Sequence, residues 1–336
     1  LGSGALFNAV RDRVQNAFSI RSLKADLAKA FDLDEKKLKA KVQYVEHHRS
    51  HLASAFFISP FEESALLSVD GMGDFSSVMR GVGRGNKIEV IDSVSYPHSL
   101  GIFYTAFTQY LGFPHFGDEY KVMGLSPYGE PKYLDQLRDV VLYRPNGLFE
   151  LNPKYFRHFK EGVTMSWANG SPHVEPLFTD AVVHAFGPQR SKQEGLSQHH
   201  KDLAASIQRL CEAVIFRMAQ DLFEKTGQKN LCLAGGVAQN SVANGKLTDQ
   251  TGFEHLFVPP AAHDAGTATG SALYYLHHQK TYPRQPFSRQ AYTGAHFSTD
   301  EVEVILRQQG IAYERLTDDE LFETTATLLA DGMVVG

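Results

Sequence analysis

The sequence contains very little cysteine. Cys211 and Cys232 are its two thiols in 336 residues, too few for a disulfide framework and compatible with a reducing cytosol. It also lacks any run of about 18 uncharged apolar residues, which a membrane-spanning helix would need, and the basic-then-apolar start of a secretory signal. We therefore expect a cytoplasmic protein that does not associate with membranes.

The sequence also has no excess of positive charge. Lys and Arg number 33 against 38 Asp and Glu, a net charge of −5, which disfavours nucleic acid as a partner because phosphate contacts need basic surface. With 43% hydrophobic and 21% charged residues, the composition is that of an ordinary globular protein. The length suggests two or three domains of about 100 to 200 residues each.

The first third of the chain changes from helical to β-rich patterns. Apolar spacing predicts two helices within residues 5–40, a short strand over 42–45 and a buried helix over 47–57 that begins with histidines. Residues 65–70, 75–82 and 88–95 are β-rich runs separated by glycine-rich turns, which predicts an antiparallel meander. A helix is then expected over 100–111.

The second half alternates helices with buried strands. An amphipathic helix is predicted over 202–226, ending at Gly227, followed by strands over 230–234 and 255–258. A helix should start near Val237, and a helix of small residues should follow over 265–276. Residues 128–195 show no clear periodicity and are interpreted as an insertion. Three meander strands followed by alternating helices and parallel strands is the element order of a ribonuclease-H-like lobe in an α/β fold.

His47 and His51 are four residues apart. On a helix they project from one face, so their imidazole nitrogens can hold one cation. In a chain with 15 histidines this spacing also arises by chance. His48 would point in another direction, where it would either pack against neighbouring residues or support the two possible ligands from behind.

Asp70 ends a predicted strand and precedes a turn that contains Gly71 and Gly73. A carboxylate there is costly unless it binds something or caps the turn, and the glycines leave backbone N–H groups open to a phosphate. The alternative is a tight hairpin turn.

Two later turns, each between a strand and a helix, also carry glycine or aspartate residues that could contact a ligand. Gly235 and Gly236 lie between a strand and a helix, where a nucleotide could press against the backbone, and Asn240, one turn further, could offer its amide to a ribose or base. Ordinary turns also use glycine. Asp264 precedes another helix, where an aspartate most often caps the N-terminus.

These residues all fall at the ends of strands or helices. In an open α/β architecture such ends meet at one cleft. Two imidazoles with one or two carboxylates suit iron, manganese or zinc and leave positions open for phosphate oxygens.

Five segments, in order along residues 40–280, carry a family resemblance: HHRSHLASAFF (47–57), LLSVDGMGDFSS (66–77), GDEYKVMGLSPYG (117–129), LAGGVAQNSVANGK (233–246) and PPAAHDAGTATGSA (259–272). They resemble the O-carbamoyltransferases of nodulation and antibiotic biosynthesis. The enzyme that forms threonylcarbamoyladenosine in tRNA is more distantly similar, through its HxxxH motif and its actin-like ATP-binding fold.

The resemblance implies a two-lobed ATP-binding domain of the actin and sugar-kinase superfamily. Carbamoyl adenylate, made from carbamoyl phosphate and ATP, would react with a hydroxyl of a sugar or other small molecule beside Fe(II) or another divalent metal. It assigns His47, His51, Asp70 and Asp264 to the metal, and Gly71, Gly73, Gly235, Gly236 and Asn240 to the nucleotide. Asp264 would also act in catalysis, as would Lys121, which could meet phosphate or acceptor or form an ion pair with Glu119.

The resemblance also implies a domain organisation. Residues 1–59 would be the remainder of the first lobe, 60–285 the second lobe, and 286–336 a connector into a YrdC-like domain that makes carbamoyl adenylate. We therefore expect a piece of a longer protein that holds the transfer site but not the complete reaction. A homo-oligomer is compatible with the sequence. The rival functions are a phosphotransferase of the same fold, which would need a carboxylate base at its acceptor site, and a nucleotide-binding module without activity.

We predict that His51→Ala removes the metal and the transfer activity while the chain still folds. Metal analysis of the purified variant beside its circular dichroism spectrum checks this, and metal retained at full stoichiometry would contradict it. Because only neutral imidazole binds metal, activity should fall below about pH 6.5.

Overall fold

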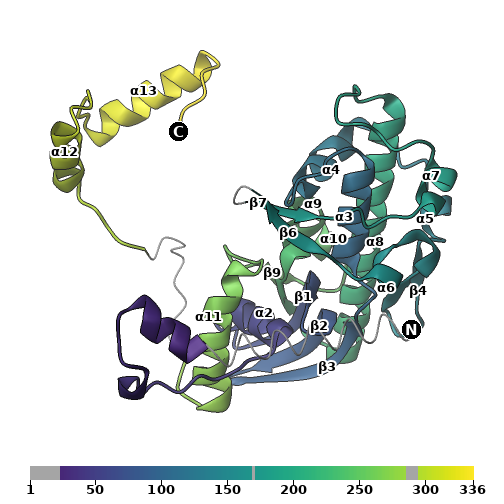
Figure 1. The fold of residues 1–336 in the computed structure, drawn as a ribbon, viewed down its shortest axis with the longest axis horizontal. Coiled ribbons are helices and arrows are strands. Elements are labelled where there is room, and N and C mark those ends of the chain that lie inside the picture. Colours follow the sequence, from purple (N-terminus) through teal and green to yellow (C-terminus); the bar gives the residue numbers. More distant parts are fainter. Residues whose placement is uncertain (1–22, 169–170, 285–293) are drawn as a thin grey trace. The chain divides into compact units, whose positions relative to one another are not determined.

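The computed structural model describes residues 23–168, 171–284 and 294–336. It divides into two compact units, Leu1–Ser288 and Arg289–Gly336 (Figure 1). The second unit contains α12 (Thr299–Gln308) and α13 (Asp318–Ala330), neither of which buries a residue. None of the described helices is both long and apolar enough to cross a membrane.

A five-stranded mixed sheet forms the centre of the first unit, in the order β3-β2-β1-β8-β9. Strands β1 (Glu63–Gly73), β2 (Ser76–Arg84) and β3 (Lys87–Ser95) pair antiparallel, which confirms the predicted meander. Strands β8 (Asn230–Ala234) and β9 (His255–Phe257) are parallel to β1 and to each other. The fold is therefore α/β with a mixed sheet, and β1 lies at its middle.

Helices cover both faces of this sheet (Figure 1). Leu67 and Val69 of β1 share one hydrophobic core with α3 (Leu100–Tyr110) and α8 (Gln198–Thr226). Leu66, on the opposite face, shares a second core with α2 (His47–Phe56). Helix α11 (Ala265–Leu273) packs against α2 and continues as a π-helical turn, η5 (Tyr274–Gln279). Because side chains alternate along a strand, β1 is buried on both sides.

The long helix α8 confirms its prediction and begins four residues before it, at Gln198. Gly227 ends it in the left-handed conformation with a φ of 63°, where its N–H bonds the carbonyl of Phe223. This geometry is favourable for glycine because it has no Cβ.

Three local predictions differ from the structure. Residues 42–45 form no strand, since a β-prone run still needs a partner strand. Residues 23–30 are helical and η1 spans Glu35–Lys37, while most of the first predicted helix lies outside the described residues. The helix expected near Val237 is a 3-10 turn, η4 (Gly236–Gln239), followed by α9 (Ser241–Asn244). Asn240 separates them because its side chain accepts the N–H of Ala243 and caps α9.

The segment interpreted as an insertion is built of short elements whose apolar side chains, such as Phe149, Phe156 and Phe186, join the core shared by β1, α3 and α8. Elements of three or four residues are too short to produce a sequence period. Together with their neighbours they are α4 (Glu119–Leu125), η2 (Ser126–Tyr128), α5 (Leu134–Leu137), β4 (Val141–Tyr143), β5 (Phe149–Leu151), η3 (Pro153–Tyr155), α6 (His158–Glu161), β6 (Met165–Ala168), β7 (Ser171–Val174), α7 (Asp180–Phe186) and, later, α10 (Leu247–Gln250).

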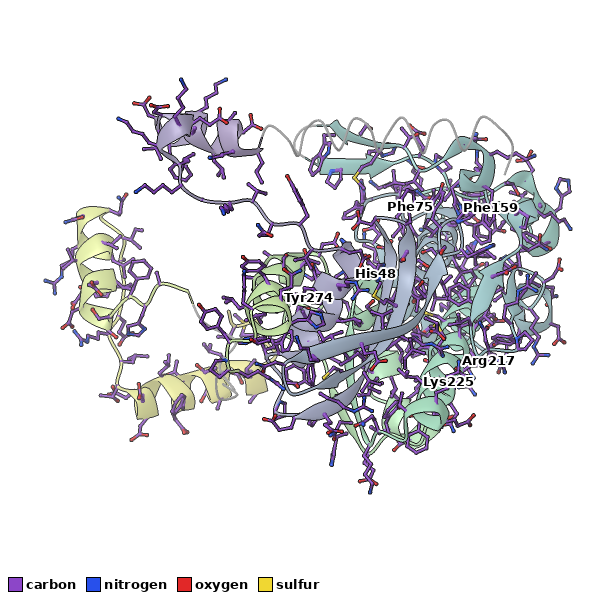
Figure 2. The ribbon with its side chains drawn as sticks, turned by 90° about the horizontal axis from the view of Figure 1, so that it is seen from below. His48, Phe75, Phe159, Arg217, Lys225 and Tyr274 are labelled. Carbon is purple, nitrogen blue, oxygen red and sulfur yellow. The ribbon has the colours of Figure 1, made fainter. Side chains whose placement is uncertain are left out.

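Arg80 of β2 is fully buried and ties this region to the sheet. Its guanidinium makes two bonds of 2.6 Å to Asp92 of β3 and one of 2.8 Å to Asp221 of α8. It also donates to the carbonyl of Asn146, in the β4–β5 turn. Lys225, labelled on α8 in Figure 2, pairs with Asp221 at 2.6 Å.

We predict that Arg80→Met destabilises the chain by about 3–5 kcal/mol, because it removes the buried guanidinium that joins β2, β3 and α8 and leaves two partly buried carboxylates with only Lys225 for compensation. Urea unfolding of the chain measures this. Arg138→Met is the matched control, since its partner is the exposed Asp135 and surface pairs contribute little. Equal midpoints for the two variants would contradict the role of Arg80.

Candidate metal centre and its cavity

Helix α2 presents two histidines at the edge of the sheet. The Glu46 carboxylate caps the helix by accepting the N–H groups of His48 and Arg49, and the Asp74 carboxylate accepts that of His47 at 2.9 Å. Four residues apart, His47 and His51 lie on one face of the helix, and their Nε2 atoms are 3.0 Å apart. His51 is fully buried and His47 partly exposed.

Strand β1 brings Asp70 to the same place. Alternation puts Asp70 on the face that carries Leu66 and packs against α2. Its Oδ2 lies 3.0 Å from Nε2 of His47 and 3.6 Å from Nε2 of His51. Its Oδ1 accepts the backbone N–H of Gly236 at 2.9 Å. Both oxygens of this buried carboxylate are therefore engaged.

Helix α11 brings the fourth residue, Asp264. The helix crosses α2 so closely that a Cβ on Gly270 would lie 1.9 Å from the Ser50 carbonyl oxygen. Asp264 holds the N-cap position, yet its carboxylate makes no capping bond. Its Oδ1 instead lies 3.6 Å and 3.5 Å from Nε2 of His47 and His51, while 72% of its side chain is exposed.

The four ligand atoms, two nitrogens and two oxygens, lie within 4.8 Å of one another and could hold a metal ion. Bonds of about 2.1 Å separate ligand atoms by about 3.0 Å at right angles and about 3.4 Å at tetrahedral angles. The nitrogen–nitrogen and nitrogen–oxygen separations run from 3.0 to 3.6 Å, so they span this range, and the longest exceed it by about 0.2 Å. The Nδ1 of His51 is buried without a hydrogen-bond partner, so packing holds that ring in place.

Charge inside the cluster is strongly coupled. Burial alone would raise the pKa of Asp70, but hydrogen bonds from His47 and His51 hold that pKa well below its usual range. Burial likewise opposes the charged form of His51, yet Asp264 and Asp70 outweigh it and raise the pKa of His51 to about 9. The metal-free cluster therefore carries a proton at neutral pH.

His48 plays a different part, as its position on α2 predicted. Burial lowers its pKa to about 4, so the ring is neutral. Its Nε2 donates to the carbonyl of Ser76 at 2.9 Å, which leaves Nδ1 to accept the Ser68 hydroxyl at 2.7 Å. His48 thus faces the sheet (Figure 2) and fastens α2 to β1 and β2.

The cluster opens into a cavity of about 580 Å³, which Asp70 and Asp264 line. Of the residues predicted to contact the nucleotide, Gly71, Gly236 and Asn240 line it as well. Asn240 also exchanges two amide hydrogen bonds with Gln208, at 2.9 and 3.0 Å. Its amide is therefore partly committed to the protein.

Gly73 and Gly235 do not line this cavity, and their surroundings give structural reasons for glycine. A Cβ on Gly73 would lie 1.9 Å from Cδ2 of His47, and one on Gly235 would lie 2.2 Å from the carbonyl oxygen of Val69. Gly235 also has a φ of 95°, which favours glycine. Both glycines therefore allow close packing beside the cluster.

Lys121 does not line the cavity either. Its Nζ lies 2.6 Å from Asp118, so its ion-pair partner is that residue rather than Glu119. Glu119 instead faces the cavity, where its carboxylate accepts the Thr105 hydroxyl at 2.5 Å. Two positions apart on a helix, Lys121 and Glu119 point in different directions.

Sequence reasoning missed most of one wall of the cavity. Glu119 lies inside a motif that was singled out, but only as a partner for Lys121. Tyr120 and Met123 lie in the same motif but were given no role. Tyr104 and Thr105 of α3 and Phe116 of the loop that follows it lie outside the motifs and had no signal of their own.

Residues 8–273 match the family described as carbamoyltransferase N-terminus, and the chain belongs to that family.

Named relatives agree with this assignment. The Synechocystis protein sll1178 is 41% identical over 94% of this chain and 50% of its own length. Nodulation protein NolNO of Sinorhizobium fredii is 36% identical over 88% of the chain and 40% of its own length. Nodulation protein NolO of Bradyrhizobium diazoefficiens is 34% identical over 87% and 49%. The chain thus spans about half the length of these relatives.

We predict that metal affinity rises about tenfold per pH unit between pH 6.5 and 8.5, because an ion must displace the His51 proton until the pH passes about 9. An ordinary imidazole would place this competition near pH 6.5. Competition of Zn²⁺ between the chain and a chromophoric chelator measures the slope. His184→Gln, which changes an exposed histidine of α7, should leave it unaltered, and a flat profile for the unmodified chain would disprove the assignment.

Proposed function

We propose that this chain is the transfer half of an ATP-dependent O-carbamoyltransferase. It would move a carbamoyl group from carbamoyl adenylate to the hydroxyl of a sugar or other small molecule. The observation that carries the proposal is the convergence of His47, His51, Asp70 and Asp264 in one cluster, whose two aspartates line a cavity, in a chain of the carbamoyltransferase family.

A divalent ion held by these four residues, Fe(II) by the family resemblance, would polarise the carbamoyl carbonyl and neutralise charge on the adenylate phosphate. The residues contribute position: β1 fixes Asp70, α2 fixes the histidines, and the exposed carboxylate of Asp264 completes the set. Lys121 has no part in this mechanism, because it pairs with Asp118 and does not line the cavity.

The rest of the cavity suits a nucleoside and a hydroxyl acceptor. Gly71 has open space at its Cα, where a Cβ would meet nothing within 4 Å, so a phosphate can approach the backbone. Aromatic faces of Tyr104 and Phe116 can pack on a base or sugar ring, and the Glu119 carboxylate can accept bonds from hydroxyl groups.

The larger arrangement is also part of the proposal. The sheet order, with an antiparallel meander beside two parallel strands, supports an actin-like and sugar-kinase-like lobe. Formation of carbamoyl adenylate from carbamoyl phosphate and ATP would belong to a YrdC-like domain beyond residues 286–336, and the protein would act in the cytoplasm.

A phosphotransferase of the same fold would need a carboxylate at its acceptor site, and Glu119 could serve as one. That carboxylate alone therefore does not separate the two functions. The two-histidine cluster does, because a phosphotransferase of this kind has no use for imidazole ligands, and the family assignment also favours carbamoyl transfer.

We predict that metal and adenine nucleotide bind cooperatively in this cavity. Calorimetric titration of ATP into the chain, performed anaerobically with and without Fe(II), should show at least about tenfold tighter binding with the metal. Asp264→Asn should abolish the difference because it removes the ligand that lies closest to solvent. Asp135→Asn, an exposed aspartate of α5, is the control and should leave the coupling intact.

Each outcome of this titration has one meaning. If Fe(II) does not change the ATP affinity of the unmodified chain or of the Asp135→Asn control, metal and nucleotide do not share a site. Coupling that survives Asp264→Asn would remove Asp264 from the ligand set. With coupling established, the full-length protein incubated with ATP, carbamoyl phosphate and a panel of hydroxyl compounds should yield a carbamate, whereas a phosphate ester would establish the phosphotransferase.

A further inference from the structure

A second cavity, of about 300 Å³, shares a wall with the first. The loop that joins α3 to α4 lines both: Gly112 and Pro114 face the second cavity, and Phe116 and Gly117 face the first. The remaining wall of the second cavity is the end of α3 at Gln109 and the segment Gln189–Lys192. None of the residues proposed for carbamoyl transfer lines it.

Arg190 lies in this wall and is only 8% exposed. Its Nη1 donates to the carbonyl of Leu111 at 3.0 Å and its Nη2 to that of Glu194 at 2.6 Å, while Nε has no partner. The guanidinium also lies 5.3 Å from the ring centre of Phe113. Among the described residues no carboxylate oxygen comes within 4 Å of it, so carbonyl dipoles and a ring face are all that balance this buried charge.

Lys192 adds a second cation to the same wall. Its Nζ lies 3.1 Å from Nε2 of His115. In the described part of the chain no carboxylate pairs with it. The acidic group nearest to this segment in sequence is Glu194, whose Oε2 lies 3.4 Å from the backbone N–H of Ser191.

We propose that this cavity binds the oxyanion group, phosphate or carboxylate, of a small molecule. Guanidinium and ammonium groups form charge-assisted hydrogen bonds with such groups. These bonds strengthen where the cation is shielded from water, as Arg190 is, whereas Lys192 is exposed. The volume is at the lower end of that of ligand pockets, enough for one such group with a small body. The inference does not depend on the carbamoyl-transfer function.

Inorganic phosphate titrated into the whole chain by calorimetry tests this. EDTA keeps metal out of the other cavity, and chloride holds the ionic strength constant. We expect saturable binding with a Kd of about 1 mM or tighter, and Lys192→Gln should weaken it at least about tenfold. Lys160→Gln, an exposed lysine of α6 that lines neither cavity, should leave it unchanged. Acetate, titrated in parallel, shows whether the site also takes a carboxylate.

Two further variants keep the result interpretable. Arg190→Lys retains the charge but loses the planar fork, so it should weaken binding while circular dichroism remains native. Glu194→Gln removes the neighbouring negative charge and should tighten binding about twofold. No saturable binding of either anion, or phosphate binding that Lys192→Gln does not change, would overturn the proposal.

Discussion

The backbone contact between α2 and α11 at Gly270 is the constraint on which the candidate centre depends. Because no Cβ separates Gly270 from the carbonyl of Ser50, the two helices approach closely enough for the N-terminus of α11 to reach the histidine face of α2. A larger residue at position 270 would force the two helices apart, because its Cβ would lie only 1.9 Å from that carbonyl oxygen. The small residues of α11 are therefore part of the centre although none of them is a ligand.

The same centre requires charge compensation as well as proximity. Asp70 is buried at the end of a strand with both oxygens bonded, one to the histidines and one to the N–H of Gly236. A buried carboxylate without such partners would be neutral or would destabilise the fold. The histidines thus stabilise Asp70, and in turn the two aspartates keep His51 protonated in the metal-free chain. An ion would replace that proton and leave the net charge of the cluster more nearly balanced.

The sequence predicted those parts that depend on local pattern. Spacing of four residues put His47 and His51 on one face, the end of a strand before a glycine-rich turn singled out Asp70, and Gly227 marked the end of α8. Local pattern could not place Glu119 in the cavity, because that depends on how α4 packs against α3. It also failed where a side chain competes with the backbone, as Asn240 does, and where a β-prone run has no neighbouring strand. The order of the meander and the parallel strands was predictable; the short elements of residues 128–195 were not, because most of them span three or four residues, too few for a repeating pattern to show.

The four residues of the centre differ greatly in exposure: His51 and Asp70 are buried, His47 is intermediate, and the side chain of Asp264 is 72% exposed. We therefore expect different residues to set the affinity for an ion and the rate at which the ion exchanges. The buried three would fix where an ion sits, whereas rotation of one surface carboxylate would decide how quickly it enters and leaves. An ion held in this way could be exchanged, or removed by a chelator, without any unfolding of the chain. The metal content of the protein should then follow the metal supply of its surroundings at a rate set by the breaking of metal–ligand bonds rather than by unfolding.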